Sequence, residues 1–536
     1  MPLPDEIVLT ILEDVDAETL GGALRVSRSF RQLAGLPRLW QRHCTWAFGL
    51  TRPGQGPTED WRQLYLRRKK VDARVQRLLS GVVGQCTQRI ALVRQLETIG
   101  ADAFDQLKAQ MQVRDTSDYL SRNYHAHSCL LYLQRQQAVA TLHRIATYGH
   151  VPLETGLGAL SLFRGGFYEE MDHKLDELRD RFLYDNPIGP STSLEEVSLL
   201  LCEFMEGEGY GRSDSFHYYD LDNSFLHTVL DVKYRTLPLT LVAIFCCLMH
   251  RLGYPDVHPI NFPAHVVARV DSAPGPFFVD MFKDDADKIV PEAMLIDRLQ
   301  ALGLATDFHF LQPASVAEVV CRSARNILNS LQRNPPQPRT QFEGLYAALC
   351  ALIILDNGHP ERLCEALASV ISSAYPFRLD VDFMTDVLLP RIEDEGTTRE
   401  LKKAIAEMSR SDRDGPIPKK RAGFAHVTHR VGEVFLHKRY EYRGVIVGWT
   451  RECEATERWQ TQMRIQDLDQ GKTQPFYNVL DEEGNARYVA QENVIPAETS
   501  TCARFLQNPD IGRYFQRFES GTFVPSADLA TEYPED

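Results

Sequence analysis

An apolar run from Leu239 to Leu252 constrains the fold of this chain more than any other stretch. Pro238 stands directly before the run, where the first position of a helix tolerates the missing N–H of proline. Gly253 follows the run and supplies a helix stop. A helix that spans a bilayer needs about 20 apolar residues, so this run is too short for one. We therefore predict a buried core helix.

Two β-rich segments follow the predicted helix, at residues 264–270 and 277–282, with the turn-forming sequence Asp-Ser-Ala-Pro-Gly-Pro between them. Pairing as a hairpin, with its turn near residues 272–274, places His265 opposite Asp280 or one pair away. Directly opposite side chains on one face of a sheet lie about 5 Å apart. A carboxylate at that distance orients an imidazole, either in a catalytic dyad or in a purely structural pair.

This order of helix and strands resembles the transglutaminase-like core, in which a Cys at a helix start is joined by a His and an Asp on the following strands. The most specific part of the resemblance, residues 219–230, contains Tyr219, Asp220, Asn223, Ser224 and Leu226. Counted back from the Leu-Gly-Tyr-Pro sequence at the helix end, the nucleophile position of the family falls on Pro238. Proline has no nucleophilic atom.

The resemblance therefore implies a transglutaminase-like core without catalytic residues, in which His265 and Asp280 are a vestigial dyad. Cys246 and Cys247 lie two turns or more from the helix start, so we interpret them as small buried residues rather than substitute nucleophiles. The alternative is a Cys-dependent acyl-transfer or hydrolase activity that uses the same dyad with another thiol. No residue spacing fits a standard metal site, and we expect no cofactor.

The composition indicates several domains and a reducing compartment. The 536 residues are enough for about three or four domains. The formal net charge of −14 disfavours broad binding to nucleic acid or anionic membranes. Eleven cysteines without a CxxC pair indicate free thiols, and the N-terminal Met-Pro-Leu-Pro-Asp-Glu-Ile-Val lacks the features of a signal peptide. We expect a cytoplasmic or nuclear protein without a membrane segment.

Residues 3–44 form a small helical unit that, at about 42 residues, is marginal alone and gains from a partner. It resembles an F-box in its Leu-Pro-x-x-Ile start at Leu3, in its Val26-Ser27-Arg28-x-Phe30 centre and in its Leu39-Trp40 end. In that family the exposed apolar residues dock onto a Skp-type adaptor, which bridges to a cullin ubiquitin ligase. The alternative is a helical hairpin that packs on its own chain. The adaptor-binding candidates are Leu3, Pro4, Ile7, Ile11, Leu12, Leu24, Val26, Phe30, Leu39 and Trp40.

Two further regions have the pattern of helices. Residues 58–150 are rich in Gln, Arg and Leu and are interpreted as a helical connector. Residues 313–410 contain consecutive amphipathic helices with Pro-rich breaks, which suggests tetratricopeptide-like packing without a clear repeat. Such helices serve either as a protein-binding groove or as a buttress for the core, and we prefer the buttress.

The C-terminal part has the pattern of short strands. Val434 and Leu436, then Val445 and Val447, alternate with polar residues, and Glu-Glu-Gly-Asn at 482–485 predicts a hairpin turn. A small SH3-like barrel of about five strands fits this length. The motifs His-Lys-Arg-Tyr at 437–440, Arg-Gly-Val-Ile-x-Gly-Trp at 443–449, Gln-Pro-Phe-Tyr at 474–477 and Tyr-Val-Ala-x-Glu-Asn at 488–493 resemble the HspQ/YccV-type domain, also called hemimethylated-DNA-binding.

The barrel is a weak candidate for DNA binding by its charge, since residues 423–496 hold nine Lys and Arg against eleven Asp and Glu. We therefore prefer recognition of protein or a degron, with DNA as the alternative. The candidate ligand-binding residues are Lys438, Arg439, Tyr440, Arg443, Trp449, Phe476 and Tyr477, of which the three last serve equally well as barrel core.

The sequence thus predicts a multidomain α+β protein whose domain order resembles the F-box only protein 21-like family. The resemblance begins almost at the first residue, so we expect any N-terminal extension to be missing. It implies a non-catalytic substrate-recognition subunit of a Skp–cullin–F-box ubiquitin ligase, which holds a target at high effective concentration near a ubiquitin-loaded enzyme. The expected boundaries are 1–48 for the F-box, 58–150 for the connector, 151–312 for the transglutaminase-like core, 313–410 for the helical segment, 420–500 for the barrel and 501–536 for the tail.

Overall fold

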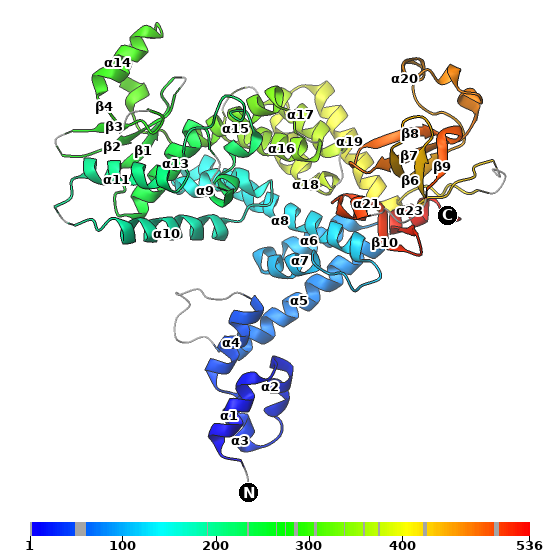
Figure 1. Cartoon of the computed structure of the whole chain (residues 1–536), viewed down its shortest axis with the longest axis horizontal. Helices are drawn as coiled ribbons and strands as arrows, with labels where there is room; N and C mark the ends of the chain where they lie inside the picture. Colours follow the sequence, from blue (N-terminus) through cyan, green and yellow to red (C-terminus); the bar gives the residue numbers. More distant parts are fainter. Residues whose placement is uncertain are drawn as a thin grey trace. The chain divides into compact units, whose positions relative to one another are not determined.

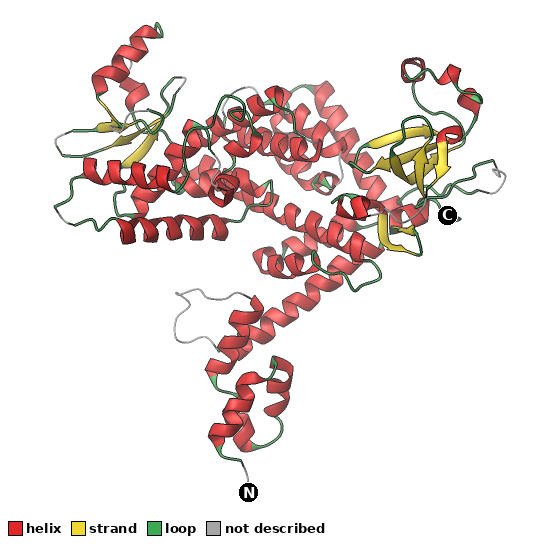
Figure 2. Ribbon diagram, in the orientation of Figure 1, coloured by secondary structure: helices red, strands yellow, loops and turns green. Residues whose placement is uncertain are grey.

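The computed structural model describes residues 3–48, 60–189, 191–232, 235–263, 265–273, 275–283, 288–304, 308–336, 338–356, 358, 360–373, 376–421, 426–497 and 503–536. The multidomain α+β class is confirmed, because helices dominate and the described strands form antiparallel sheets (Figure 2). The chain divides into two compact units. The terminal unit contains Met1–Leu130 and Arg410–Asp536, and the central unit contains Leu131–Ser409.

The first helices of the terminal unit form a small separate core. They are α1 (Asp5–Asp14), α2 (Ala17–Ala23), α3 (Arg28–Ala34) and α4 (Pro37–Phe48), labelled in Figure 1. Asp16 and Ser27 act as N-caps, since their side chains accept the backbone N–H of Thr19 and of Phe30. The indole of Trp40 donates a 2.8 Å hydrogen bond to the carbonyl of Ala34. The buried residues of this core are Val8, Leu12, Ala17, Leu20, Ala23, Leu24, Ala34, Leu39 and Trp40.

The connector is helical, as its sequence predicts. Its elements are α5 (Trp61–Gly84), α6 (Arg89–Glu97), η1 (Gly100–Ala103), α7 (Phe104–Gln110) and α8 (Tyr119–Tyr148). Arg68 of α5 pairs with Asp102 and Asp105, which fixes α7 and the turn before it against α5. Since α8 contains the boundary between the two units, its second half belongs to the central unit.

The core helix predicted from the apolar run is confirmed. In the central unit α13 (Pro238–Arg251) carries Pro238 in its first turn, and every residue from Leu239 to Met249 is buried. The helix ends where Gly253 adopts a positive φ of 95°, a conformation that glycine reaches without strain. The helices that precede it are α9 (Leu153–Leu162), α10 (Tyr168–Asp185), α11 (Leu194–Gly207), η2 (Leu221–Ser224) and α12 (Leu226–Val232).

A four-stranded antiparallel sheet packs against α13 and is continued by one more helix (Figure 1). It consists of β1 (Val257–Ile260), β2 (Val267–Val270), β3 (Phe277–Val279) and β4 (Ile289–Val290) in that order, followed by α14 (Glu292–Ala301). The predicted hairpin is present as β2 and β3, with Ala268 opposite Val279. Both strands are shorter than predicted, so His265 and Asp280 lie in the loops that flank them.

The helical segment shares its packing with the transglutaminase-like part. It contains η3 (Phe308–Leu311), α15 (Val316–Arg333), α16 (Pro338–Leu355), α17 (Glu361–Ser373), η4 (Phe377–Leu379), α18 (Val381–Phe383), η5 (Met384–Leu388), η6 (Leu389–Arg391) and α19 (Glu395–Asp414). Helix α15 contacts α9, and the hydroxyl of Ser323 donates to the carbonyl of Ser224. Arg135 of α8 forms a fully buried ion pair with Asp380. These contacts join the helical segment to the transglutaminase-like part and to α8.

The C-terminal barrel has the five strands that its sequence predicts. They are β5 (Val434–His437), β6 (Arg443–Thr450), β7 (Phe476–Asp481), β8 (Ala486–Ala490) and β9 (Val494–Pro496), in the order β8-β7-β6-β5-β9. The predicted hairpin turn joins β7 to β8, where the Asp481 carboxylate accepts the backbone N–H of Glu483 and of Asn485. Short helices α20 (Glu457–Gln462), η7 (Ile465–Asp467), η8 (Gly471–Thr473) and η9 (Gln491–Asn493) interrupt the strands.

The tail packs into the same hydrophobic core as the barrel. Its elements are α21 (Ala503–Gln507), α22 (Ile511–Tyr514), the hairpin β10 (Phe515–Glu519) and β11 (Thr522–Pro525), and α23 (Ala527–Glu532). Phe505, Phe515 and Phe523 are buried with the barrel residues Val445 and Trp449. The chain therefore forms one core from residues 427–533 rather than a barrel with a separate tail.

Candidate functional site

The two side chains of the predicted dyad meet in the central unit. His265 Nε2 lies 2.9 Å from Asp280 Oδ1, and the same carboxylate accepts the backbone N–H of Phe282 at 3.0 Å. Arg298 of α14 approaches its other oxygen at 3.5 Å. Burial raises the pKa of Asp280, but the hydrogen bond and the charge of His265 more than offset it, so the pKa is lowered overall. Asp280 is thus held as a carboxylate that orients the imidazole.

Helix α13 begins at Pro238, the position that the sequence resemblance predicts for the family's nucleophile, and proline has no nucleophilic atom. Cys246 and Cys247 are fully buried further along α13. Burial raises the pKa of both thiols, and the Cys247 thiol donates to the carboxylate of Glu154 at 3.4 Å. Neither thiol is a thiolate at neutral pH, so neither is an activated nucleophile.

The loop before β2 is held by one arginine of the helical segment. Arg322 of α15 donates to the carbonyl oxygens of Phe262, at 3.0 Å, and His265, at 2.8 Å. Burial lowers the pKa of Arg322. Burial raises the pKa of the nearby Tyr218 phenol, and the charge of Arg322 offsets part of that rise. Within the described part of the chain Arg322 pairs with no carboxylate. It is a half-buried cation satisfied by backbone carbonyls alone.

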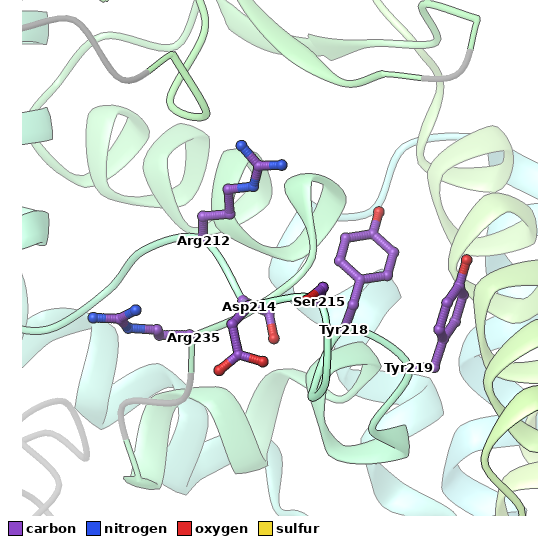
Figure 3. Close-up of a pocket in the computed structure, with 7 residues that line it drawn as sticks. Arg212, Asp214, Ser215, Tyr218, Tyr219 and Arg235 are labelled. Carbon is purple, nitrogen blue, oxygen red and sulfur yellow. The ribbon is translucent and has the colours of Figure 1, made fainter.

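A pocket of about 590 Å³ opens beside Tyr218, and Figure 3 shows its lining. We call it the arginine pocket. Arg212 and the tyrosine hydroxyls extend to one side of the loop that forms it, while the Asp214 carboxylate points to the opposite side (Figure 3). The lining residues are Arg212, Ser213, Asp214, Ser215, Tyr218, Tyr219 and Arg235.

Backbone hydrogen bonds join the two segments that supply the arginines. Thr236 donates its N–H to the carbonyl of Gly211 at 2.9 Å and accepts the N–H of Ser213 at 3.2 Å. The side-chain amide of Asn223 donates to the carbonyl of His217 at 2.7 Å. The backbone carbonyl of Asn223 accepts hydrogen bonds from the hydroxyls of Thr236, at 2.8 Å, and Thr240, at 3.0 Å. Buried Asn223 therefore fixes both walls of the pocket, which gives a physical role to the most specific stretch of the sequence.

Sequence reasoning did not identify this pocket. Arg212 and Arg235 belong to no recognisable motif and are brought together by an isolated pairing between Arg212 and Thr236. The one available signal was Asn223, which lies in the stretch that most resembles the transglutaminase-like family. Among the described residues, no group of three or more His, Cys, Asp or Glu side chains is arranged to hold a metal ion.

The F-box candidates divide into an exposed set and a buried set. We call the exposed set, Leu3, Ile7, Ile11 and Val26, the apolar face, and their side chains are 48–69% exposed. Pro4 is exposed as well, and Phe30 is half-buried. The assignment of Leu12, Leu24, Leu39 and Trp40 to the adaptor surface is wrong, because all four are at most 8% exposed and fill the core of the unit. Both sides of α1 are apolar, and only one of them is covered.

The barrel candidates on the turn between β5 and β6 lie at the surface. Lys438, Arg439 and Tyr440 are exposed, and the buried imidazole of His437 accepts the backbone N–H of the latter two at 3.1 Å. Arg443 is half-buried, with Glu482 at 3.9 Å. Lys438 and Arg439 form no ion pair within the described residues.

The three aromatic candidates within the strands are core residues, so of the two roles that the sequence left open for them the structure supports the barrel core. Trp449, Phe476 and Tyr477 are at most 1% exposed. Phe476 stacks on Tyr488 with ring centroids 5.0 Å apart, and the Tyr477 hydroxyl donates to the side chain of Gln491 at 2.6 Å. Phe476 and Tyr477 are consecutive in β7 and point to opposite faces of the sheet, so both faces are covered at this position.

Comparison with known proteins supports all three resemblances. The family model described as F-box-like matches residues 2–46, the transglutaminase-like superfamily model matches residues 167–325, and the model described as hemimethylated DNA-binding protein YccV like matches residues 427–522. The resemblances inferred from the sequence are thus confirmed. No helix of the described residues is long and apolar enough to cross a membrane.

Curated relatives of the chain are named F-box only protein 21. The chain is 26% identical over 371 residues to that of Pongo abelii and 27% identical over 367 residues to that of Homo sapiens. These matches cover 65% of this chain and 55–56% of the relatives, so the chain spans about half the length of the curated relatives it matches. No solved structure matches the chain.

Proposed function

We propose that this chain is a substrate-recognition subunit of a Skp–cullin–F-box ubiquitin ligase. The observation that carries the proposal is the apolar face of the F-box-like unit. Ile7 and Ile11 are 48% and 51% exposed one turn apart on α1, while Val8 and Leu12 on the same helix are buried. An F-box-like family match over residues 2–46 and the F-box name of the relatives support it.

The apolar face has the properties of half an interface. Large apolar side chains exposed together on a unit of this size mark a surface that a partner covers. Leu3 adds a further exposed apolar side chain just before the N-terminus of α1, the helix that carries Ile7 and Ile11 four residues apart on one face. A Skp-type adaptor that covers this face links the chain to a cullin. The rest of the chain then holds a target within reach of the ubiquitin-loaded enzyme, which raises the effective concentration of the target.

The transglutaminase-like core acts in this proposal as a binding scaffold without catalysis. Pro238 at the nucleophile position and the burial of Cys246 and Cys247 support this view. In the same view His265 and Asp280 form a structural pair, with Arg298 as a further partner of the carboxylate.

The barrel serves in this proposal as a second protein-binding element. Lys438, Arg439 and Tyr440 form its exposed candidate surface, because the other aromatic candidates are core. The ligase subunit works in the cytoplasm or nucleus, where the adaptor and the cullin are found.

The test is co-purification of a Skp-type adaptor with an Ile7→Asp/Ile11→Asp variant. Two charges on the apolar face would have to be buried unpaired in the interface, which costs several kcal/mol and removes a micromolar contact. An Ile417→Asp variant is the control, because Ile417 is 84% exposed outside the F-box-like unit. Leu12→Asp is unsuitable, since Leu12 is 3% exposed and its replacement unfolds the unit. Full adaptor binding by the folded double variant would disprove the proposal.

A further inference from the structure

Positive charge gathers around the arginine pocket in a chain whose formal net charge is −14. Arg212 and Arg235 line the pocket, and Arg322 is close enough to Tyr218 that its charge partly offsets the rise that burial causes in the pKa of the Tyr218 phenol. None of these three guanidinium groups forms an ion pair with a carboxylate of the described residues. A site with unneutralised cations of this kind attracts an anion.

The one acidic side chain of the lining is already hydrogen-bonded within its own loop. Asp214 accepts the backbone N–H groups of Phe216 and His217 at 2.9 Å, and its carboxylate lies 2.9 Å from His217 Nδ1. The hydrogen bond and charge of Asp214 raise the pKa of His217, which favours an imidazolium beside the carboxylate. Asp214 also points away from Arg212 (Figure 3). It caps the loop and leaves the arginines available.

Hydrogen-bond donors on the pocket wall suit a carboxylate. The Arg212 guanidinium and the hydroxyl groups of Tyr218 and Tyr219 extend to the same side (Figure 3). Burial raises the pKa of the Tyr218 phenol, so it remains a donor at neutral pH. A guanidinium fork beside two phenols binds a planar carboxylate through charge-assisted hydrogen bonds.

An exposed aromatic side chain lies in the same loop. Phe216 is 89% exposed and is placed between the pocket residues Ser215 and Tyr218. The backbone around it is fixed, because Asp214 caps it from one side and Asn223 holds the carbonyl of His217 from the other. A rigid exposed aromatic beside a cationic pocket has the character of an interface hot spot.

We propose that the arginine pocket binds an acidic segment of the proteins that the chain recruits, with a carboxylate on Arg212 and the tyrosine hydroxyls and an apolar side chain against Phe216. This inference rests on the proposed function, which it deepens by naming the chemistry of the recognised segment. A polyanionic nucleic acid is disfavoured, because two exposed cations replace few counterions and the net charge of the chain repels it. The pocket volume of about 590 Å³ accommodates one or two side chains.

The test uses the full chain and the peptide Asp-Glu-Phe-Asp-Glu-amide with fluorescein on its N-terminal amine, with binding followed by anisotropy at low and physiological salt. An Arg212→Gln/Arg235→Gln variant should bind about tenfold more weakly, since the charge-assisted contact with Arg212 and the positive charge of Arg235 at the pocket are lost. Phe216→Ala should weaken binding about three- to tenfold. Arg362→Gln is the matched control, because Arg362 is exposed on α17 of the same unit, and it should leave affinity within about twofold.

Three results of the peptide titrations overturn the inference. They are no binding of the acidic peptide, equal binding of its Asn-Gln-Phe-Asn-Gln counterpart, and equal loss in the double variant and the control. Tighter binding of a single-stranded oligonucleotide than of the peptide, lost in the same double variant, would assign the pocket to nucleic acid and also overturn it. Adaptor co-purification is measured on the same variants. If the double variant loses peptide binding but still co-purifies the adaptor, the result supports the pocket. If the wild-type chain binds the peptide but does not co-purify an adaptor, the result contradicts the proposed function and leaves the pocket standing.

Discussion

The indole Nε1 of Trp449 donates a 3.0 Å hydrogen bond to the carboxylate of Asp536. The same carboxylate oxygen accepts the backbone N–H of Val431 at 3.1 Å, and Arg421 pairs with the other oxygen. The Asp536 side chain is 1% exposed. The tail of the chain thus completes the barrel core, and this relationship removes Trp449 from the surface that a ligand meets.

Removal of this carboxylate should therefore destabilise the barrel. Asp536→Ala leaves the Arg421 guanidinium beside a buried site without its counterion and the Trp449 N–H without an acceptor. We expect a loss of about 3–5 kcal/mol in the free energy of unfolding, as for other broken buried pairs. Urea unfolding followed by tryptophan fluorescence measures it. Asp467→Ala is the control, because Asp467 is exposed, and it should cost less than about 0.5 kcal/mol. Similar losses in the two variants would contradict the role of Asp536.

Acid should destabilise the central unit through His227. Burial, aided by the charge of Arg164, lowers the pKa of this imidazole to about 4. The unfolded chain binds a proton near pH 6.5 while the folded chain stays neutral, so stability is full above pH 6.5 and falls as the pH drops toward 4. The expected loss over that window is about 3 kcal/mol.

The measurement is the free energy of urea unfolding at several pH values between 7 and 4. His227→Gln cannot take up the proton, so its curve should be flatter than that of the wild type by the His227 contribution. His173→Gln serves as the control, because the His173 side chain is 72% exposed, and its curve should follow the wild type. A wild-type curve parallel to that of His227→Gln would show that His227 does not titrate in this way.

The fold could be predicted from the sequence where one pattern decides one structure. The run that follows Pro238 is apolar on every side, which only a buried helix accommodates, and α13 is that helix. The hairpin register was fixed by its turn, so the meeting of His265 and Asp280 followed from counting residues.

The candidate surfaces could not be sorted in the same way, since burial depends on what packs from elsewhere in the chain. Ile7 and Leu12 are equally apolar, but Leu12 meets the core of the F-box-like unit and Ile7 meets solvent. Trp449 is buried by residues of the C-terminal tail, and the alternation of apolar residues in the strands does not predict that the tail packs there. The arginine pocket depends on a single backbone pairing between residues far apart in sequence, and hydrophobic periodicity does not predict such a contact.

The thiols of the core helix should be unreactive in the folded protein. Burial raises the pKa of Cys246 and Cys247, and the thiolate is the form that reacts. Iodoacetamide at pH 8, followed by peptide mass spectrometry, should modify half-buried Cys86 and leave both core cysteines unmodified until the chain is unfolded in urea. His265→Ala should leave this pattern unchanged. A cysteine of the core whose labelling by an acyl probe depends on His265 would contradict the non-catalytic interpretation.

The barrel should bind duplex DNA weakly at most. Of its cationic candidates, Lys438 and Arg439 are exposed, whereas Arg443 faces Glu482 at 3.9 Å. Two phosphate contacts predict a slope of only about −1.8 when the logarithm of the binding constant is plotted against the logarithm of salt concentration. A titration of the full chain with a duplex, with and without hemimethylation, should give dissociation constants above about 10 µM at physiological salt.

A protein segment, unlike DNA, can bind the turn between β5 and β6 through an aromatic side chain as well as through positive charge. Tyr440 is 61% exposed, and the Arg439 guanidinium lies 5.4 Å from its ring centroid, so the two present one flat cationic and aromatic surface. Arg439→Ala/Tyr440→Ala should therefore reduce capture of a subset of target proteins and leave adaptor binding intact, because neither side chain supports the F-box-like unit. Removal of the whole barrel is a poor substitute, since Leu120 and the tail share its core. Sub-micromolar, methylation-dependent duplex binding that is lost in Lys438→Gln/Arg439→Gln would make DNA, rather than protein, the preferred ligand of the barrel. Such an affinity exceeds what two phosphate contacts supply at physiological salt.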